Sequence, residues 1–454
     1  MRIPFGTNAY QLRSTPFSAQ DMVNCYLEVA PPAAKTFAAV VQSYGIRPRQ
    51  VIGTGYARGG IVLNGIPYVV YGPTLYRLTL TTATALGTVP GADFVDMAGD
   101  GINIMLVTES RGFYYDGVTV QEITDPDFPG AAWVENIDGY YVVQEPSSGR
   151  FYVSANRDPS SWDALEFATA EQAPDDLVGG IVNQGEIFLF GKESFEVNYV
   201  GTNPDFPLER TASGSGDIGL LSRFGAASCD NTVFFPGHDG IVYRMEGYTP
   251  VRVSQHGIEQ AIENMADKTC FAMSWKEGGH SFYGLSFDTM TLVYDVASQQ
   301  WHRRKSINRD RWRPLFILRA FDTWITGDFY TNELGELDPN YFTEFGQVLI
   351  SSATSPPVGK DNEIITHDEV QLVFQQGVGL PSGQGYDPQV MLQWSDDGGR
   401  TWSSERWRPL GKMGEYRKRG PTWNALGSAR DRVYRFSISD PVRRTLILAT
   451  TEAA

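Results

Sequence analysis

One short stretch near the C-terminus has the spacing of a motif found in enzymes that cleave glycans. Ser395, Asp397, Gly399 and Trp402 match the Asp-box pattern S-x-D-x-G-x-x-W. The pattern also has a structural explanation. The serine and aspartate side chains bond the amides of their own turn, the glycine takes a positive φ, and the tryptophan packs under the turn. A single box therefore predicts a stabilised hairpin, and a glycosidase is the alternative interpretation.

The remaining carboxylates and histidines form no pattern typical of a catalytic or metal site. Asp175-Asp176 and Asp396-Asp397 are adjacent pairs, but adjacency means little in a chain with 53 acidic residues. The histidines, which have no ligand-type partner at metal-site spacing, are His238, His256, His280, His302 and His367. The sequence therefore predicts no catalytic residues, no metal ligands and no cofactor.

Two further features resemble sites and are interpreted as structural. The Ser/Gly run at residues 213–216 lacks the Lys-Ser/Thr pair and the apolar helix of a phosphate loop, so we expect a flexible excursion between repeat units. Cys25, Cys229 and Cys270 are odd in number and far apart, without nearby Cys or His ligands. We expect them to be reduced and buried.

The overall charge argues against a protein that grips nucleic acid by its phosphates. The chain has 37 Lys and Arg against 53 Asp and Glu, a net charge of -16, whereas such proteins present a basic face. An acidic channel wall would instead let DNA slide past, because like charges repel within a Debye length of about 10 Å. Acidity also keeps proteins soluble, so both explanations stay open.

One local cluster opposes this charge. Its basic members are Arg303, Arg304, Lys305, Arg309, Arg311 and Arg313, with Trp301 and Trp312 among them. A basic and aromatic surface could face nucleic acid. Because Arg and aromatic side chains dominate interface hot spots, we expect the cluster to contact an acidic neighbouring subunit.

The elements that must position these residues are short β-strands. Between residues 188 and 210 an apolar run is followed by a Gly191-Lys192 turn and a strand in which Phe195, Val197 and Tyr199 alternate with polar residues. That period of two is typical of a half-buried strand. One such hairpin is not stable alone, so it must belong to a larger sheet.

The same unit recurs every 36 to 48 residues. Seven units begin with a turn, at Asn64-Gly65, Asp100-Gly101, Asp138-Gly139, Gln184-Gly185, Asp230-Asn231, Gly278-Gly279 and Asp322-Thr323. Units of about 40 to 50 residues with four short antiparallel strands are typical of propeller blades. We predict an all-β fold containing a β-propeller of six or seven blades, the last unit being weak; a sandwich is the alternative.

Composition divides the chain into four parts. We predict an N-terminal arm and lead-in over residues 1–54, the propeller over 55–345, a linker over 346–363, and a C-terminal antiparallel β domain resembling a sandwich over 364–454. Residues 256–268 have apolar side chains at helical spacing and predict a short helix outside the propeller. No stretch has the roughly 20 apolar residues of a membrane helix, and the N-terminus lacks a signal-peptide core, so we expect an intracellularly made, soluble protein without membrane insertion.

A set of short motifs occurs in a fixed order along the chain. It comprises Asn24, Tyr26 and Glu28; Arg58-Gly59; Leu75-Tyr76-Arg77; Phe190-Gly191, Ser194 and Glu196; Phe206-Pro207 and Arg210; Val242-Tyr243-Arg244; Gly247-Tyr248; Ile258-Glu259; Tyr294-Asp295; and Trp301-His302. In this order the motifs resemble the packaged-DNA stabilisation, or tail hub (nozzle), proteins of short-tailed bacteriophages. The resemblance covers residues 20–305, and the C-terminal β domain shows no motif assignable to that family.

The resemblance implies a structural virion protein of the phage tail without enzymatic activity. Such proteins form a ring, commonly a homohexamer, below the portal and its adaptor, the head-tail connector. The ring extends the DNA channel, retains packaged DNA, supports DNA ejection and carries tail fibres, spikes or a needle. It also implies contact with passing double-stranded DNA without sequence-specific binding, and assembly in the host cytoplasm.

Two other functions fit a phage-tail propeller. A glycan-hydrolysing propeller would need carboxylates and Arg residues clustered at the propeller mouth. A lectin-like propeller would bind glycans without cleaving them. The sequence offers no further feature that favours either.

Overall fold

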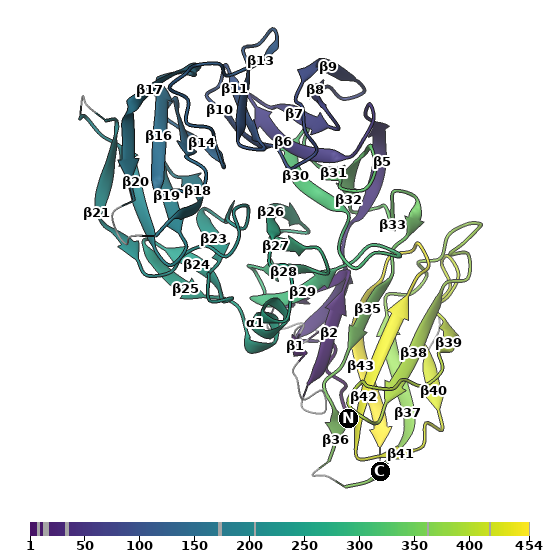
Figure 1. Ribbon diagram of the computed structural model, residues 1–454. Helices are drawn as coiled ribbons and strands as arrows, with labels where there is room; N and C mark the ends of the chain where they lie inside the picture. The colour runs from purple at the N-terminus through teal and green to yellow at the C-terminus, as the bar shows by residue number, and fades with distance from the viewer. Residues whose placement is uncertain are drawn as a thin grey trace.

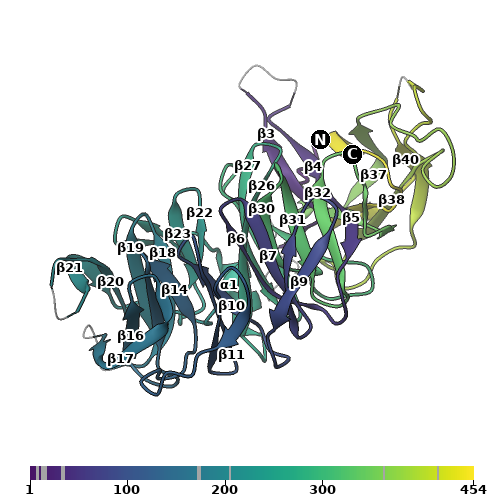
Figure 2. The ribbon, with the colours of Figure 1, turned by 90° about the horizontal axis from the view of Figure 1, so that it is seen from above.

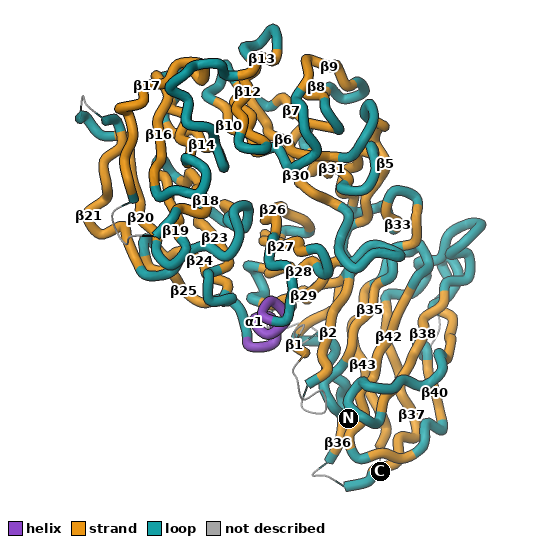
Figure 3. Tube along the Cα trace, viewed as in Figure 1, coloured by secondary structure: helices purple, strands orange, loops and turns teal. Residues whose placement is uncertain are grey.

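The computed structural model describes residues 1–6, 10–11, 18–31, 36–170, 175–203, 206–360, 363–416 and 419–453. These residues form β-strands with one short helix among them (Figure 3). Seven four-stranded blades surround a common centre, and a two-layered β-sandwich lies beside them (Figure 1). The predicted all-β architecture of propeller and sandwich is confirmed, with seven blades. No helix in the described part of the chain is long and apolar enough to cross a membrane.

Five blades are each built from four consecutive antiparallel strands. Blade 1 contains β6 (Ala57–Leu63), β7 (Ile66–Tyr71), β8 (Thr74–Leu78) and β9 (Ala83–Thr88), and blade 2 contains β10 (Asp96–Gly99), β11 (Ile104–Thr108), β12 (Arg111–Tyr115) and β13 (Val120–Glu122). Blade 3 contains β14 (Val134–Ile137), β15 (Tyr140–Gln144), β16 (Arg150–Ala155) and β17 (Asp158–Thr169), and blade 4 contains β18 (Leu177–Asn183), β19 (Glu186–Gly191), β20 (Phe195–Val200) and β21 (Leu208–Gly216). Blade 5 contains β22 (Ala227–Cys229), β23 (Thr232–Pro236), β24 (Val242–Glu246) and β25 (Thr249–Arg252). Contacts within these blades are local in sequence.

Blade 7 closes the propeller with a strand from the other end of the chain. Blade 6 contains β26 (Cys270–Glu277), β27 (His280–Phe287), β28 (Thr291–Asp295) and β29 (Gln300–Arg304), and blade 7 contains β30 (Pro314–Ala320), β31 (Thr323–Asp328), β32 (Glu333–Asp338) and β5 (Gly45–Val51). In the β32–β5 pair, Leu337 lies opposite Ile46. The seventh repeat looked weak in the sequence because its fourth strand is N-terminal.

The first turn of each blade was placed correctly in six cases. In blade 2, Asp100 and Gly101 lie in a longer connection between Gly99 and Ile104. In blades 1, 3, 4, 5 and 6 the predicted pair forms a two-residue hairpin in which both residues have positive φ, as Asn64 (50°) and Gly65 (76°) do. These angles match the twist of the flanking strands. In blade 7 the predicted Asp322-Thr323 turn is shifted by one residue: Phe321 and Asp322 have the positive φ values, and Thr323 begins β31.

The sandwich combines strands from both ends of the chain. One sheet contains β1 (Tyr10–Gln11), β2 (Ala19–Val23), β35 (Ser351–Thr354), β36 (Val358–Gly359), β42 (Asp431–Ile438), β38 (Gln389–Ser395) and β39 (Arg406–Pro409), and the other contains β3 (Cys25–Val29), β4 (Ala38–Gln42), β43 (Thr445–Ala453), β37 (Ile365–Phe374), β40 (Thr422–Asn424) and β41 (Ser428–Ala429). Their shared core includes Met22, Val40, Leu372 and Phe436. Because Met22 and Val40 belong to this core, the sandwich needs residues from both the N-terminal and the C-terminal parts of the chain.

Two segments that were expected to be connections contain β-strands in the structure. Residues 1–54, expected as an arm and lead-in, supply β2, β3 and β4 to the sandwich and β5 to the propeller. Residues 346–363, expected as a linker, contain β35 and β36, which both pair with β42. Two short strands, β33 (Thr343–Glu344) and β34 (Gln347–Val348), extend blade 7 toward them. Composition did not reveal these strands because their partners lie far away in the sequence.

Two local predictions had opposite outcomes. The helix expected over residues 256–268 is α1 (His256–Glu263), with Ile258 and Ile262 buried between blades 5 and 6. The Ser/Gly run is not a flexible excursion, because it ends β21 and pairs with β20. Added side chains would collide with Val197 at Gly214 and with Phe195 at Gly216, so the glycines allow close packing.

The three cysteines are free and buried, as predicted. Burial raises the pKa of each thiol, that of Cys25 to about 12. Seen from above in Figure 2, the sandwich lies at one end of the molecule and β16, β17, β20 and β21 of blades 3 and 4 lie at the other.

Candidate functional site

The propeller and the sandwich meet at a continuous junction, formed by blades 6 and 7 with β2, β3 and β35. Strand β2 pairs in parallel with β29 through Val23 and Arg303, and pairs antiparallel with β35. Blade 6 and the first sandwich sheet are therefore one hydrogen-bonded sheet. Two parts joined in this way move together more readily than parts joined by a linker.

Asn24 sits where the chain passes from one sandwich sheet to the other. It has φ 54° and is only 2% exposed. Its Nδ2 donates to the carbonyl oxygens of Lys305 and Ile350, each at 2.8 Å, and its Oδ1 accepts from the Lys305 amide at 2.9 Å. Asparagine suits the position because it tolerates left-handed backbone angles. One side chain thus ties the N-terminal strands to blade 6 and to the segment entering β35.

The basic cluster lies mostly inside the junction, so its expected contact with a neighbouring acidic subunit is wrong for its main members. Arg304 and Glu277 form an ion pair with side chains 1% and 0% exposed. Arg303 pairs with Asp21 of β2, and Arg313 is buried against Asp328. The acidic partners therefore come from the same chain. Lys305 and Arg309 are the exposed members.

Aromatic rings complete the environment of Arg304. Its guanidinium lies 5.6 Å from the Trp275 ring centroid and 5.1 Å from that of Trp312. The Trp312 Nε1 in turn donates to Glu344 Oε1 at 2.6 Å. Burial raises the pKa of Glu277, and the adjacent Arg304 charge opposes that effect. Glu277 is tolerated as a buried carboxylate because Arg304 pairs with it.

His280 links the propeller to β3 through two carboxylates. Its Nδ1 lies 2.8 Å from Asp295 Oδ2, and its Nε2 lies 2.8 Å from Glu28 Oε2. The hydrogen bond with Asp295 raises the pKa of His280 to about 9 against the effect of burial, so the imidazole is cationic at neutral pH. No local spacing in the sequence signals this site, because Glu28 is 252 positions away from His280.

The other histidines are structural or exposed. Burial lowers the pKa of His302 well below its usual range and that of His367 to about 4. The His367 Nδ1 lies 2.9 Å from the Tyr434 hydroxyl, and His238 Nδ1 accepts from the Gly219 amide. His256 is exposed on α1. Among the described residues, no group of three or more His, Cys, Asp or Glu side chains could hold a metal ion.

Arg444 secures the junction from the sandwich side. Its guanidinium donates to the carbonyl oxygens of Leu349, Phe342 and Asp440 and to Ser351 Oγ. Burial lowers its pKa to about 10. The bonds to residues 342–351 hold the chain as it leaves blade 7.

The Asp box has the predicted turn geometry. Ser395 Oγ accepts from the Gly399 amide at 2.7 Å, and Asp397 Oδ1 accepts from the Arg400 and Thr401 amides, each at 2.9 Å. A bond from the Thr401 hydroxyl is the main cause that lowers the pKa of Asp397. Gly399 has φ 90°.

The adjacent carboxylate pairs also bond within their own surroundings. Asp396 pairs with Arg432 at 2.6 Å. Asp175 accepts from the Ser194 hydroxyl at 3.0 Å, and Asp176 pairs with Lys192 at 2.6 Å. These contacts explain both pairs as supports for turns and strands.

The centre of the propeller is crowded by aromatic rings. Phe94 lies 4.3 Å from Phe224 and 5.0 Å from Phe271, measured between ring centroids. All three line a cavity of about 250 Å³ to which five inner strands contribute. The carboxylate lining it, Asp96, accepts from the Val134 amide of the next blade, and burial raises its pKa to about 6. Asp96 therefore has a structural bond across two inner strands.

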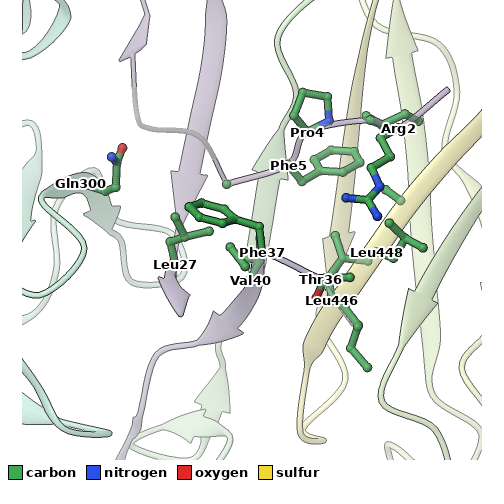
Figure 4. Close-up of a pocket in the computed structure, with 15 residues that line it drawn as sticks. Arg2, Pro4, Phe5, Leu27, Thr36, Phe37, Val40, Gln300, Leu446 and Leu448 are labelled. Carbon is green, nitrogen blue, oxygen red and sulfur yellow. The ribbon is translucent and has the colours of Figure 1, made fainter. Parts of the chain in front are cut away.

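The sandwich carries a separate apolar opening of about 310 Å³ (Figure 4). Phe5, Leu27, Val40 and Leu446 line it, and Phe37 stands at its rim with 76% of its surface exposed. Its lining offers apolar contact and has few polar groups for catalysis.

Comparison with known proteins agrees with this two-part architecture. A family model described as "Bacteriophage P22 Gp10, beta-propeller" matches residues 1–342, and one described as "Bacteriophage P22 Gp10, beta-sandwich" matches residues 352–454. The second match extends to the region where the sequence showed no assignable motif. No curated protein matches the chain.

Solved structures with detectable similarity are distant. The computationally designed Ika8 protein is 11% identical with a TM-score of 0.41, covering 73% of this chain and 99% of its own. The β-propeller domain of Cps50 (Swd1) from Myceliophteria thermophila is 7% identical with a TM-score of 0.44, covering 64% and 98%. These values carry no argument about function. From the two family matches, which together span nearly the whole sequence, the chain belongs to the bacteriophage P22 Gp10 family, a family of phage tail structural proteins.

Proposed function

We propose that the protein is the ring-forming hub, or nozzle, of a phage tail, positioned below the portal and its adaptor. The ring is a homohexamer that extends the DNA channel, retains the packaged genome and supports its ejection. It is assembled in the host cytoplasm and carries fibres, spikes or a needle. Family membership supports the tail location.

The observation that carries the proposal is the junction. A hub must pass force from the portal to the tail without bending between its domains. Here β2 joins the two parts in one sheet, and the Arg304–Glu277 pair is buried beside it. Breaking such a pair leaves a buried charge without compensation, which disfavours opening of the junction. The body is therefore suited to a passive mechanical role.

The acidic surface suits a channel for DNA. The net charge of -16 recurs in every copy of a ring, and such a wall repels phosphates instead of binding them. Double-stranded DNA would then pass without sequence-specific contact.

Reconstitution tests the proposal. Purified protein should be monomeric or weakly associated alone and should form rings when added to a portal–adaptor complex, as measured by mass photometry and negative-stain electron microscopy. A stable monomer that ignores this complex would contradict the proposal. Release of reducing sugar from host surface glycans by the purified protein would instead favour the glycosidase.

A further inference from the structure

The two ends of the molecule differ sharply in charge. Blades 2 to 4, within residues 89–216, contain 22 Asp and Glu but only five Lys and Arg. The C-terminal residues 364–454 contain ten Asp and Glu and twelve Lys and Arg. Blades 3 and 4 lie at the end of the molecule opposite the C-terminal residues (Figures 1 and 2). With this distribution, the acidic region of one copy attracts the basic region of a second copy. Two acidic regions, or two basic regions, repel each other.

The basic end has an exposed surface with aromatic side chains, which we call the sandwich edge. Its residues are Arg406, Trp407 and Arg408 of β39, and Lys412, Met413 and Tyr416 of the following loop. Strand β39 is the last strand of its sheet, and all three of its residues 406–408 are exposed. A strand at the border of a sandwich ordinarily buries alternate side chains, so exposure on both faces indicates a surface without its cover.

The apolar and charged groups of the sandwich edge are available for contact. Trp407 is 51% exposed, Met413 58% and Tyr416 82%. Arg406 lies over the Trp394 ring and Lys412 over the Tyr386 ring, each at 4.7 Å from the centroid. In the described part of the chain, neither cation has a carboxylate within ion-pair distance. Trp, Tyr and Arg are the side chains that most often dominate protein interfaces.

The acidic end has a complementary surface, which we call the β17 face. It consists of Asp163, Leu165, Glu166 and Phe167 on β17, the outer strand of blade 3. Leu165 is 82% exposed and Phe167 38%. The strand thus presents apolar side chains between carboxylates, whereas the sandwich edge presents apolar side chains between cations.

We propose that the sandwich edge of one copy docks on the β17 face of the next copy. The inference rests on the proposed ring and names the surfaces that build it. The two faces differ and lie at opposite ends, so each contact leaves one of each kind free, and repeated contacts close into a ring when the rotation permits. A twofold contact would instead bring like charges together.

Duplex DNA is a weaker fit to the sandwich edge. The exposed cations there are few, and the same chain carries a net charge of -16 that repels phosphates. Proteins that bind DNA through its backbone present an extended basic face. The apolar area of Trp407, Met413 and Tyr416 would also remain unmatched on a phosphate backbone.

Charge reversal on each face tests the proposal in the full-length protein. The doubly substituted variants R406E/R408E and D163K/E166K should each lower ring formation on the portal–adaptor complex by about tenfold or more. In a mixture of the two variants, copies that alternate around the ring have opposite charges at every contact, so mixing should restore assembly. Combining all four substitutions in one chain reverses both faces together and should also restore rings. Arg430→Glu, at another exposed position of the sandwich, is the matched control and should assemble like the unsubstituted protein.

The outcomes separate this inference from the proposed hub function. If the unsubstituted protein forms rings and both reversed variants form them equally well while their melting temperatures are unchanged, the docking surfaces are wrong and the hub function stands. If the unsubstituted protein forms no rings on the complex, the hub function fails. If R406E/R408E forms normal rings but loses binding to a 30-base-pair duplex in a gel-shift assay, the sandwich edge contacts DNA and the docking proposal is overturned.

Discussion

Blades 2 to 4 and the junction use the same kind of sheet, but they differ in how their charges are placed. In blade 2, Arg111 and Glu122 pair at the surface with 44% of each side chain exposed. In the junction, Arg304 and Glu277 are almost completely enclosed. The outer blades fold from consecutive strands, whereas the junction gathers segments from three distant parts of the chain. Buried charge is therefore concentrated where separate segments must meet in one arrangement.

The largest expected effect comes from breaking the buried pair. Glu277→Gln leaves the Arg304 charge buried without a counter-ion and should lower the free energy of unfolding by about 3–5 kcal/mol. The matched change in blade 2, Glu122→Gln, removes an exposed pair and should cost less than about 1 kcal/mol. Urea denaturation of both variants measures the difference. Equal losses of stability in the two variants would mean that the buried pair at the junction contributes no more than the exposed pair in blade 2.

Two asparagines with left-handed backbone angles differ in the same way, one in the junction and one in an outer blade. Asn24→Ala removes three buried hydrogen bonds at the junction and should cost about 2–4 kcal/mol. Asn64 has nearly the same φ, but it lies in an exposed hairpin of blade 1 and makes one bond, to the Gly101 carbonyl. Asn64→Ala should cost about 1 kcal/mol, most of it backbone strain. Thermal unfolding measures the stability of both variants. A larger loss of stability in Asn64→Ala than in Asn24→Ala would contradict the prediction.

His280 makes the stability of the junction depend on pH. Its pKa is about 9 in the folded protein and 6.5 in the unfolded chain, so its stabilising effect is complete below about pH 6.5 and is lost as the pH rises through 9. Facing groups are Asp295, Glu28 and the Tyr26 ring, with the Glu277 carboxylate nearby. Allowing for the half-exposed Glu28, the unsubstituted protein should lose about 2 kcal/mol over this range.

The variant His280→Gln isolates that effect. It should be less stable near pH 6.5 and should show a flatter stability profile up to pH 9.5 in urea denaturation. His256→Gln, on the exposed surface of α1, serves as the control and should leave the profile unchanged. A steep profile that survives His280→Gln would assign the pH dependence to another group.

Local patterns predicted the blades well. Apolar alternation and turn residues placed six of the seven first turns, because a hairpin is specified by residues that are adjacent in sequence. The Asp box was likewise predicted in detail, since its bonds join residues 395–401. The Ser/Gly run was misjudged because composition alone does not tell a loop from a strand that packs closely on Phe195.

The junction could not be predicted in the same way. The run of arginines at 303–313 suggested an outward-facing contact, because Asp21 and Glu277 are not its neighbours in sequence. His280 looked isolated for the same reason. The role of a charged side chain depends on the groups around it. In the junction, these groups come together only when the chain folds.

Residue types and their spacing alone define the strands, their turns, the repeat and which stretches of the chain are acidic or basic. Long-range contacts in the folded protein establish that β5 completes blade 7, that β2, β3 and β4 belong to the sandwich, and which charges are buried. The reason is physical. Strand and turn preferences act over a few residues, whereas strand partners and the dielectric environment of a charge depend on contacts between segments that the chain brings together from hundreds of positions apart.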